Sequence, residues 1–125
     1  MKVLLDTTVL VDILRGKGEG YRMASVLLSN DSLPMTSVIN VAEIHAGLRG
    51  GEEPQAARLI GSLDVLPVTT VIAVRAGELV RTWARKGRTL ALDDMLVAAT
   101  AIEYRLTLAT NNRKDFPMPE IKLFS

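Results

Sequence analysis

The sequence predicts an α/β domain built around a mainly parallel sheet. Short apolar runs alternate along the chain with longer segments of helical periodicity, and this alternation is typical of βαβ connections. No internal repeat, low-complexity segment or linker interrupts the 125 residues, so we expect one domain over residues 1–125. Hydrophobic residues make up 48% of the chain, which is enough to bury a core without disulfides.

The first half of the chain is expected to form two strands and four helices. The strands cover residues 2–5 and 33–35, and the helices cover residues 7–15, 21–28, 36 or 37 to the glycine pair at 50 and 51, and 54–63. Thr7 or Thr8 can cap the first helix. Three glycines within residues 16–20 predict a mobile or tightly turned loop. His45 falls on the apolar stripe of the third helix, where a core position is more common than a catalytic one.

The second half is expected to supply the remaining strands and two helices. The strands cover residues 65–68, 107–110 and 121–124, and the helices cover residues 70–86 and 93–104. Pro67 lacks a backbone N–H and therefore favours an edge position for its strand. The last helix is apolar nearly all round, which is typical of a central helix. Trp83 on the preceding helix is expected to be packed.

Acidic and amide side chains recur at the ends of these elements. They are Asp6 after the first strand, Glu43 on the third helix, Asp93 and Asp94 at the start of the last helix, and Asn112 and Asp115 after the strand at 107–110. Ligands of parallel sheets bind beyond the carboxyl ends of the strands, where these positions can meet. Converging carboxylates repel one another unless one is protonated or a hard divalent cation such as Mg²⁺ or Mn²⁺ joins them.

Each of these positions also has a simpler explanation. Asp6 suits an Asx turn or a helix cap, and Asn40 with Glu43 has the spacing of a capping box. One of Asp93 and Asp94 can cap the last helix while the other projects into a cleft. The residues after the strand at 107–110 suit a polar turn. The prediction of a site therefore depends on the set, because no single member requires one.

Composition and motifs exclude several other classes of protein. The chain has no cysteine and one histidine, which argues against a zinc hydrolase, and it has no phosphate-binding glycine loop and no nucleophile elbow. Asp6 and Asp12 interrupt any signal peptide, and no apolar run approaches the ~20 residues that span a bilayer. We therefore expect a cytoplasmic protein without membrane contact.

Basic residues cluster in one segment although the net charge is only +1. The cluster comprises Arg81, Arg85, Lys86 and Arg88. These side chains can either complement the dipole at a helix C-terminus or contact phosphates of a nucleic-acid backbone.

Four segments together resemble the PIN-domain nucleases, and in particular the VapC-type toxins of toxin–antitoxin pairs. The segments are residues 4–10 around Asp6, residues 37–44 around Glu43, residues 94–101 after Asp94, and residues 108–116 around Asn112 and Asp115. Each segment alone is a weak signal, but the four in this order cover nearly the whole chain. The resemblance implies a three-layer α/β/α fold with a central, mainly parallel sheet.

The resemblance also implies a site and a reaction. The family's acidic positions carry over onto Asp6, Glu43 and Asp94, and Thr8 matches the hydroxyl residue that assists at the metal site. The fourth acidic position falls on Asn112, which has an oxygen but no charge, so Asp115 could supply the missing charge. Asp93 is an additional acid beside the main site. It remains open whether Glu43 binds the metal or orients the attacking water, and whether one or two metals bind.

The implied activity is cleavage of RNA by an Mg²⁺- or Mn²⁺-dependent endoribonuclease. Asp6 and Asp94 would hold the metal, and the basic cluster would contact the RNA backbone. A homodimer and a small antitoxin partner are implied as well. The sequence leaves two alternatives open. One is a non-catalytic binding module that kept the fold, which Asn112 favours, and the other is a metal-dependent phosphomonoesterase.

Overall fold

The computed structural model describes residues 1–124 and places their strands side by side in one sheet. The strands are β1 (Lys2–Leu5), β2 (Leu33–Ser37), β3 (Asp64–Leu66), β4 (Thr107–Ala109) and β5 (Lys122–Leu123). They lie in the order β3-β2-β1-β4-β5, and every neighbouring pair is parallel. The prediction of a mainly parallel sheet is confirmed. β3 ends just before Pro67 and forms one edge of the sheet, as the proline predicted.

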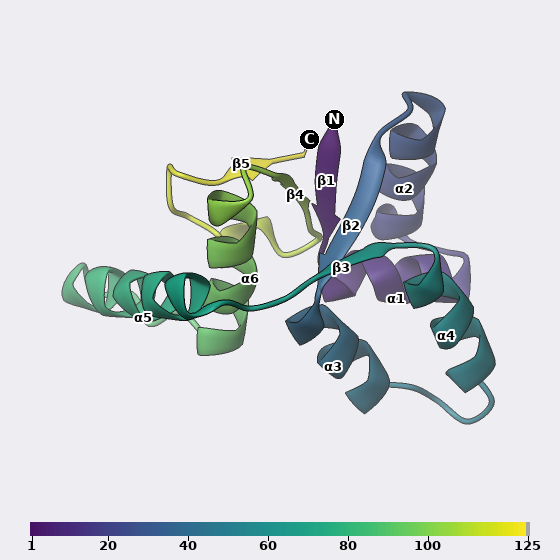
Figure 1. Ribbon diagram of the computed structural model, residues 1–125, viewed down its shortest axis with the longest axis horizontal. Helices are drawn as coiled ribbons and strands as arrows, with labels where there is room; N and C mark the ends of the chain where they lie inside the picture. Colours follow the sequence, from purple (N-terminus) through teal and green to yellow (C-terminus); the bar gives the residue numbers. More distant parts are fainter. Residues whose placement is uncertain (125) are drawn as a thin grey trace.

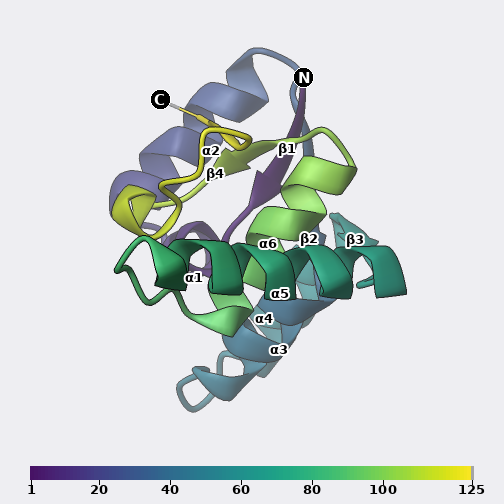
Figure 2. The ribbon, with the colours of Figure 1, turned by 90° about the vertical axis from the view of Figure 1, so that its left-hand side faces the viewer.

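Helices cover both faces of this sheet. They are α1 (Thr7–Arg15), α2 (Glu19–Ser29), α3 (Val38–Ala46), α4 (Glu53–Gly61), α5 (Thr70–Arg85) and α6 (Leu92–Glu103), with a short 3₁₀ turn over Arg113–Asp115. In Figure 1, α5 and α6 lie on one side of the strands, and α1, α2 and α4 lie on the other. Figure 2 looks onto the face that α5 and α6 cover. The three-layer arrangement that the resemblance implied is therefore confirmed.

The core is divided by the sheet because successive residues of a strand point to opposite faces. On β1, Leu4 packs on the side of α5 and α6 with Leu79 and Met95. Val3 and Leu5 face the other side, where the buried residues of α1 and α2 meet them. All three β1 residues are at most 3% exposed. α6 is buried over most of its surface, which confirms its predicted central place.

The third helix differs from its prediction in how it packs. α3 lies beyond the carboxyl ends of β1 and β2 instead of lying flat on the sheet (Figure 1). Ile44 is buried, but Val38 is 41% exposed and His45 is exposed, so the predicted apolar stripe is only partly used and the core placement of His45 was wrong. The capping box is formed by Ser37 and Asn40, which corrects the predicted pairing of Asn40 with Glu43.

The glycine-rich loop is a tight turn between α1 and α2. α2 begins at Glu19, two residues earlier than predicted, after Gly18 adopts a positive φ of 91°. The Gly20 backbone N–H donates to the Asp12 carboxylate over 2.9 Å. A Cβ at Gly20 would lie 2.7 Å from the Val9 Cα, so only glycine permits this approach of the two helices.

Within residues 1–124, every helix is too short or too polar to cross a bilayer.

Candidate active site

The carboxylate of Asp6 lies at the carboxyl end of β1, the central strand of the sheet. The side chain is 4% exposed. Its Oδ2 accepts a hydrogen bond from the Thr110 hydroxyl over 2.7 Å, and its Oδ1 accepts one from the Asn40 amide over 3.2 Å. Asp6 occupies the N-cap position of α1 but its side chain does not cap the helix, and neither threonine that follows is the cap. The predicted capping role of Thr7 or Thr8 was therefore wrong, and the Asp6 carboxylate is directed into the site.

Glu43 reaches the same region from α3. Its Oε1 accepts a hydrogen bond from the Thr7 hydroxyl over 2.6 Å, and this contact joins α3 to the start of α1. The side chain is half-buried. Glu43 is thus not a fully solvated helix residue.

Asp93 and Asp94 lie in the first turn of α6. The N-cap position is Ala91, and the structure shows no side-chain cap there, so the prediction that one of the two aspartates caps this helix was wrong. Asp93 is exposed and Asp94 is half-buried. Both carboxylates remain available at the helix N-terminus, where the helix dipole favours negative charge.

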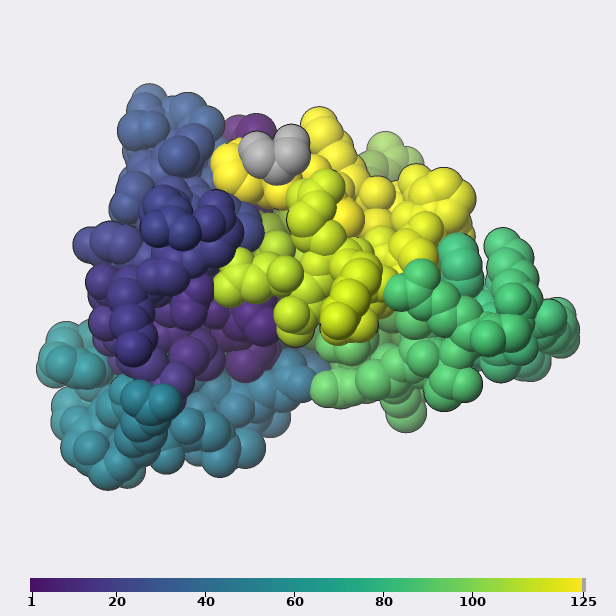
Figure 3. Space-filling view, turned by 180° about the vertical axis from the view of Figure 1, so that it is seen from behind, coloured from purple at the N-terminus to yellow at the C-terminus, as the bar shows by residue number. Residues whose placement is uncertain are grey.

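The segment after β4 completes the site. The Asn112 backbone N–H donates to the Thr110 hydroxyl over 3.0 Å, and this hydroxyl in turn donates to Asp6. The Asn112 side chain is exposed, whereas Asp115 at the end of the 3₁₀ turn is half-buried. Thr8 lies beside this segment, and its hydroxyl accepts from the Asn111 backbone N–H over 3.1 Å. Figure 3 shows the purple start of the chain bordered by the yellow-green residues after β4 and the blue residues of α3.

The acidic side chains share one electrostatic environment. Burial raises the pKa of Asp6 above its usual range, hydrogen bonds from neighbouring residues oppose this rise, and repulsion by Asp93 adds to it. Burial, repulsion by Asp93 and then repulsion by Asp6 and Asp115 raise the pKa of Asp94 to about 6. Asp115 is therefore close enough to Asp94 for its charge to raise the pKa of Asp94.

Glu43 belongs to the same group of acids. Burial, together with a hydrogen bond shared with Asp93, raises the pKa of Glu43 to about 7, and the Thr7 hydroxyl partly offsets this rise. Repulsion by Asp93 and Asp6 contributes further. A carboxyl group with this pKa is close to half-protonated at neutral pH, which is the range in which a side chain can accept or release a proton.

The donor set suits a hard divalent cation. Carboxylate and hydroxyl oxygens lie at the site, and the mutual repulsion of the carboxylates is the property that a cation would relieve. No three acidic or histidine side chains within residues 1–124 are arranged to enclose a metal by themselves. Mg²⁺ usually retains several waters and binds through one or two carboxylates, so the residues present fit a hydrated ion.

Three polar residues of the site were not among those predicted from the sequence. Thr7, Asn40 and Thr110 make the hydrogen bonds that hold Asp6 and Glu43. The sequence indicated Asn40 only as a candidate member of a capping box. Thr110 is 104 positions from Asp6, and no local pattern could have predicted their contact.

Comparison with known proteins identifies the family of this chain. The PIN domain family model matches residues 3–119. Ribonuclease VapC10 of Mycobacterium tuberculosis is 40% identical over 118 residues, covering 94% of this chain and 88% of the relative. The tRNA(fMet)-specific endonuclease VapC of Salmonella typhimurium is 28% identical over 129 residues, covering 98% and 96%. The structure of VapBC2 from Rickettsia felis, bound to a promoter DNA fragment, contains a chain with 26% identity and a TM-score of 0.81, covering 99% and 98%. The resemblance seen in the four motifs is confirmed, and the chain belongs to the PIN-domain family, within the VapC group of ribonucleases.

Proposed function

We propose that this VapC-type ribonuclease is an Mg²⁺- or Mn²⁺-dependent endoribonuclease and the toxin of a toxin–antitoxin pair. Asp6 and Asp94 would hold the metal, and Asn112 and Asp115 would complete the site. The observation that carries this proposal is that Asp6, Glu43 and Asp94, from distant parts of the chain, meet at the carboxyl end of the sheet, where burial and then mutual repulsion raise their pKa values. PIN-domain ribonucleases of this type generally depend on a divalent metal.

The other polar residues have supporting roles in this proposal. A bound divalent ion would neutralise charge on the scissile phosphate and lower the pKa of the attacking water. Glu43 would bind that ion or orient the water, and its pKa of about 7 allows it to take up the proton that the water loses. Thr8 and Asp93 would support the metal site from its rim.

Among the basic cluster, Arg88 is best placed to contact RNA near the site. Its Nη2 donates to the Lys114 backbone carbonyl, which lies in the same turn as Asp115.

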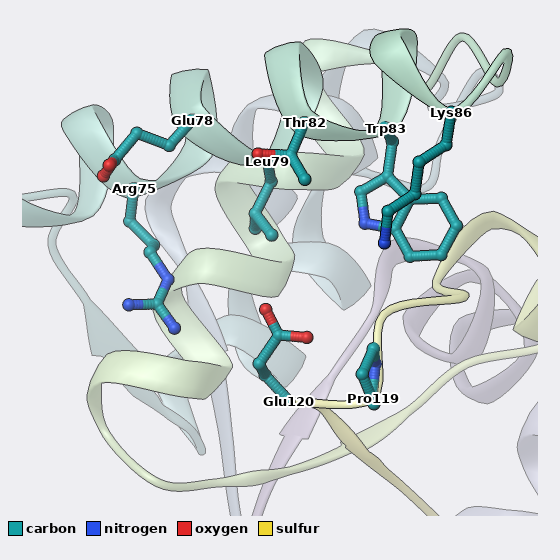
Figure 4. Close-up of a pocket in the computed structure, with 8 residues that line it drawn as sticks. All are labelled: Arg75, Glu78, Leu79, Thr82, Trp83, Lys86, Pro119 and Glu120. Atoms are coloured by element: carbon teal, nitrogen blue, oxygen red, sulfur yellow. The ribbon is translucent and has the colours of Figure 1, made fainter.

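Lys86 lies over the Trp83 ring, 4.5 Å from the ring centroid. Figure 4 shows this pair at a cavity of about 220 Å³ whose charged lining residues are Arg75, Lys86, Glu78 and Glu120. Two acids balance the two cations there, so this cavity does not favour a phosphate. Trp83 is half-buried against the core, as predicted.

Arg88→Gln is expected to raise KM for RNA about 3- to 10-fold. It should also reduce the slope of the logarithm of the binding constant against the logarithm of the salt concentration by about 0.7, the value for one phosphate contact on a single strand. Arg88→Lys keeps the charge and should retain the slope. Arg58→Gln, on α4 at the opposite face of the sheet, is the matched control and should change neither quantity. RNA binding measured across a salt series checks this prediction, and an unchanged slope in Arg88→Gln would contradict it.

A small antitoxin is the expected protein partner. The Rickettsia felis relative was solved as a VapBC2 complex, which supports an equivalent partner for this chain. Opposite charge is favourable among the carboxylates, so an arginine or lysine of the antitoxin could block the site. An apolar groove between α1, α2 and α4, lined by residues such as Ile13, Leu27 and Leu59, could hold an apolar segment of that partner.

A homodimer is also proposed, and exposed valines suggest where it forms. Val65 on the edge strand β3 is 37% exposed, and Val71 and Val74 on α5 are 63% and 57% exposed. An unpaired strand edge with apolar neighbours is a common contact surface. Light scattering of the wild type and of Val71→Lys tests this proposal, because the variant should be monomeric if the valines form the contact.

Product analysis tests the activity against its alternatives. The purified protein is incubated with a panel of structured RNAs, tRNAs included, in Mg²⁺, Mn²⁺ or EDTA. Release of oligonucleotides in either metal but not in EDTA is expected. Release of inorganic phosphate would indicate a phosphomonoesterase instead, and inactivity on every RNA, with a partner protein bound, would indicate a binding module.

A further inference from the structure

The buried amide of Asn40 connects the start of α3 to the acidic site. Asn40 is 0% exposed. Its Oδ1 accepts hydrogen bonds from the Ser37 hydroxyl over 2.6 Å and from the Ser37 backbone N–H over 3.3 Å. Its own backbone N–H donates to the Ser37 hydroxyl oxygen. These contacts form the capping box and fix the orientation of the amide, with the oxygen towards Ser37.

The nitrogen of this amide must then find acceptors elsewhere. A capping box needs only the side-chain oxygen of its second residue, so both N–H groups of the fully buried Asn40 amide are left over. Leaving them unpaired would be costly. They donate to Asp6 Oδ1 over 3.2 Å and to the Thr7 hydroxyl oxygen over 3.0 Å.

The direction of the Thr7 hydroxyl follows from this contact. Because the Asn40 N–H can only donate, the Thr7 oxygen accepts, and its own proton is free to point elsewhere. It points to Glu43 Oε1, 2.6 Å away. One amide therefore orients the Asp6 carboxylate, just after β1, directly. It orients the Glu43 carboxylate on α3 through the Thr7 hydroxyl, which binds only Oε1.

We propose that Asn40 and Thr7 are positioning residues that set the orientation of Asp6 and Glu43 relative to each other. This inference rests on the proposed nuclease function. Neither residue needs to touch RNA or metal. A rotation that moves a site oxygen by about 1 Å can cost 10²-fold in rate, so the effect of losing this network should appear in kcat.

The first test measures the network without metal or substrate. Thr7→Val removes the hydroxyl at nearly constant volume, and Glu43→Ala removes its acceptor. Urea unfolding of the wild type, both single variants and the double variant is followed in EDTA at about pH 8, above the pKa of Glu43. Thr7→Val is expected to lower the urea midpoint in the wild type and to lower it at most half as far in the Glu43→Ala background.

Thr36→Val is the matched control for this cycle. Thr36 is 0% exposed, and its hydroxyl donates to the Leu5 backbone carbonyl over 3.0 Å, without contact to a carboxylate. Its effect on the urea midpoint should be the same with Glu43 or with alanine at position 43. Equal shifts for Thr7→Val in the two backgrounds would show that the hydroxyl does not act through Glu43, and this would overturn the proposal.

The second test is kinetic and separates positioning from general loss of structure. Thr7→Val is expected to lower kcat about 10- to 100-fold with KM within about twofold of the wild type, and Thr7→Ser should restore kcat to within about threefold. In the Glu43→Ala background, Thr7→Val should change kcat less than about twofold. Thr36→Val should leave kcat unchanged. A loss of kcat in Thr36→Val as large as in Thr7→Val would overturn the proposal.

Asn40→Leu removes the amide at similar volume and tests the other member of the pair. We expect it to lower kcat as far as Thr7→Val does, and to lower it no further when the two are combined. Asn40→Leu also loses the capping box, which lowers the free energy of unfolding. If this variant does not fold, the Thr7 variants decide the outcome. Inactivity of the wild type would refute the nuclease function, but the urea measurements would still be valid. If the enzyme is active and the effects of Thr7→Val and Glu43→Ala on the urea midpoint simply add, only the positioning role is refuted.

Discussion

The Asp94→Asn variant is expected to cut RNA at least ~10³-fold more slowly than the wild type. A metal ligand contributes several kcal/mol to stabilising the charge of the transition state, and each 1.36 kcal/mol changes the rate tenfold. The same variant is expected to unfold at the same temperature as the wild type or at a higher one. Asp94 is repelled by Asp93, Asp6 and Asp115, and replacing its carboxylate by an amide removes this repulsion. A loss of activity without a loss of stability is the signature of a functional acid.

Single-turnover cleavage and thermal unfolding in EDTA measure these two effects on the same preparation. Asp64→Asn is the matched control, because Asp64 is an exposed aspartate on the edge strand β3, away from the site. It should leave the cleavage rate unchanged. If Asp94→Asn retained a rate within tenfold of the wild type, Asp94 would not be a metal ligand.

The metal-free protein is expected to lose stability as the pH rises from about 5 to about 8. The pKa of Asp94 is about 6 and that of Glu43 about 7 in the folded protein, both above the usual range of about 4 in an unfolded chain. Between these values the folded state binds more protons than the unfolded state, so the free energy of unfolding falls with increasing pH. The loss is complete once the pH passes the folded pKa of Glu43. Asp6, whose pKa is also raised, acts in the same direction.

Unfolding by urea in EDTA at a series of pH values measures this dependence. The pKa of Glu52 is lowered by its hydrogen bond to Arg15, so Glu52 makes the free energy of unfolding rise with pH. This contribution changes only below the ordinary pKa of 4.5, outside the pH range of this series. Adding Mg²⁺ or Mn²⁺ should stabilise the protein more at pH 8 than at pH 5, because protons compete with the metal. The Glu43→Gln variant should show a weaker dependence on pH. Stability that rises between pH 5 and pH 8 without metal would contradict the assignment of a repulsive site.

The order and type of the elements could be predicted because they depend on short-range patterns. The apolar run over residues 3–5 and the nearly all-apolar α6 are both buried in the structure. The edge position predicted from Pro67 was correct, although β3 ends at Leu66 and the proline that was predicted inside the strand follows it. The boundaries were less certain where glycine or capping chemistry decides them, as at Glu19.

The packing of α3 could not be predicted from its periodicity. An apolar stripe indicates that one face of a helix is buried, but it does not indicate what covers that face. Because α3 extends past the ends of the strands, Val38 and His45 remain exposed. The polar residue Asn40 is buried instead, since it has partners in Ser37, Asp6 and Thr7.

The acids of the site could be predicted as a set, whereas the contacts between them could not. Asp6 follows β1 and Asp115 lies in the turn after β4, so the parallel topology alone places both beyond the carboxyl ends of the strands. The hydroxyls that orient the carboxylates depend on distances of a few tenths of an ångström between segments far apart in sequence. Thr110 and Thr7 therefore became apparent only in the folded chain.

Calorimetric titration with Mn²⁺ of the wild type and of Asp6→Asn, Asp94→Asn and Asp64→Asn tests most directly whether these carboxylates form one metal site. We expect binding to the wild type and to Asp64→Asn with equal affinity. We expect at least ~10-fold weaker binding to Asp6→Asn and to Asp94→Asn, since losing even an indirect partner of a metal site costs 10- to 100-fold. Equal Mn²⁺ affinity in all four proteins would contradict the assignment of Asp6 and Asp94 as the metal ligands of this ribonuclease.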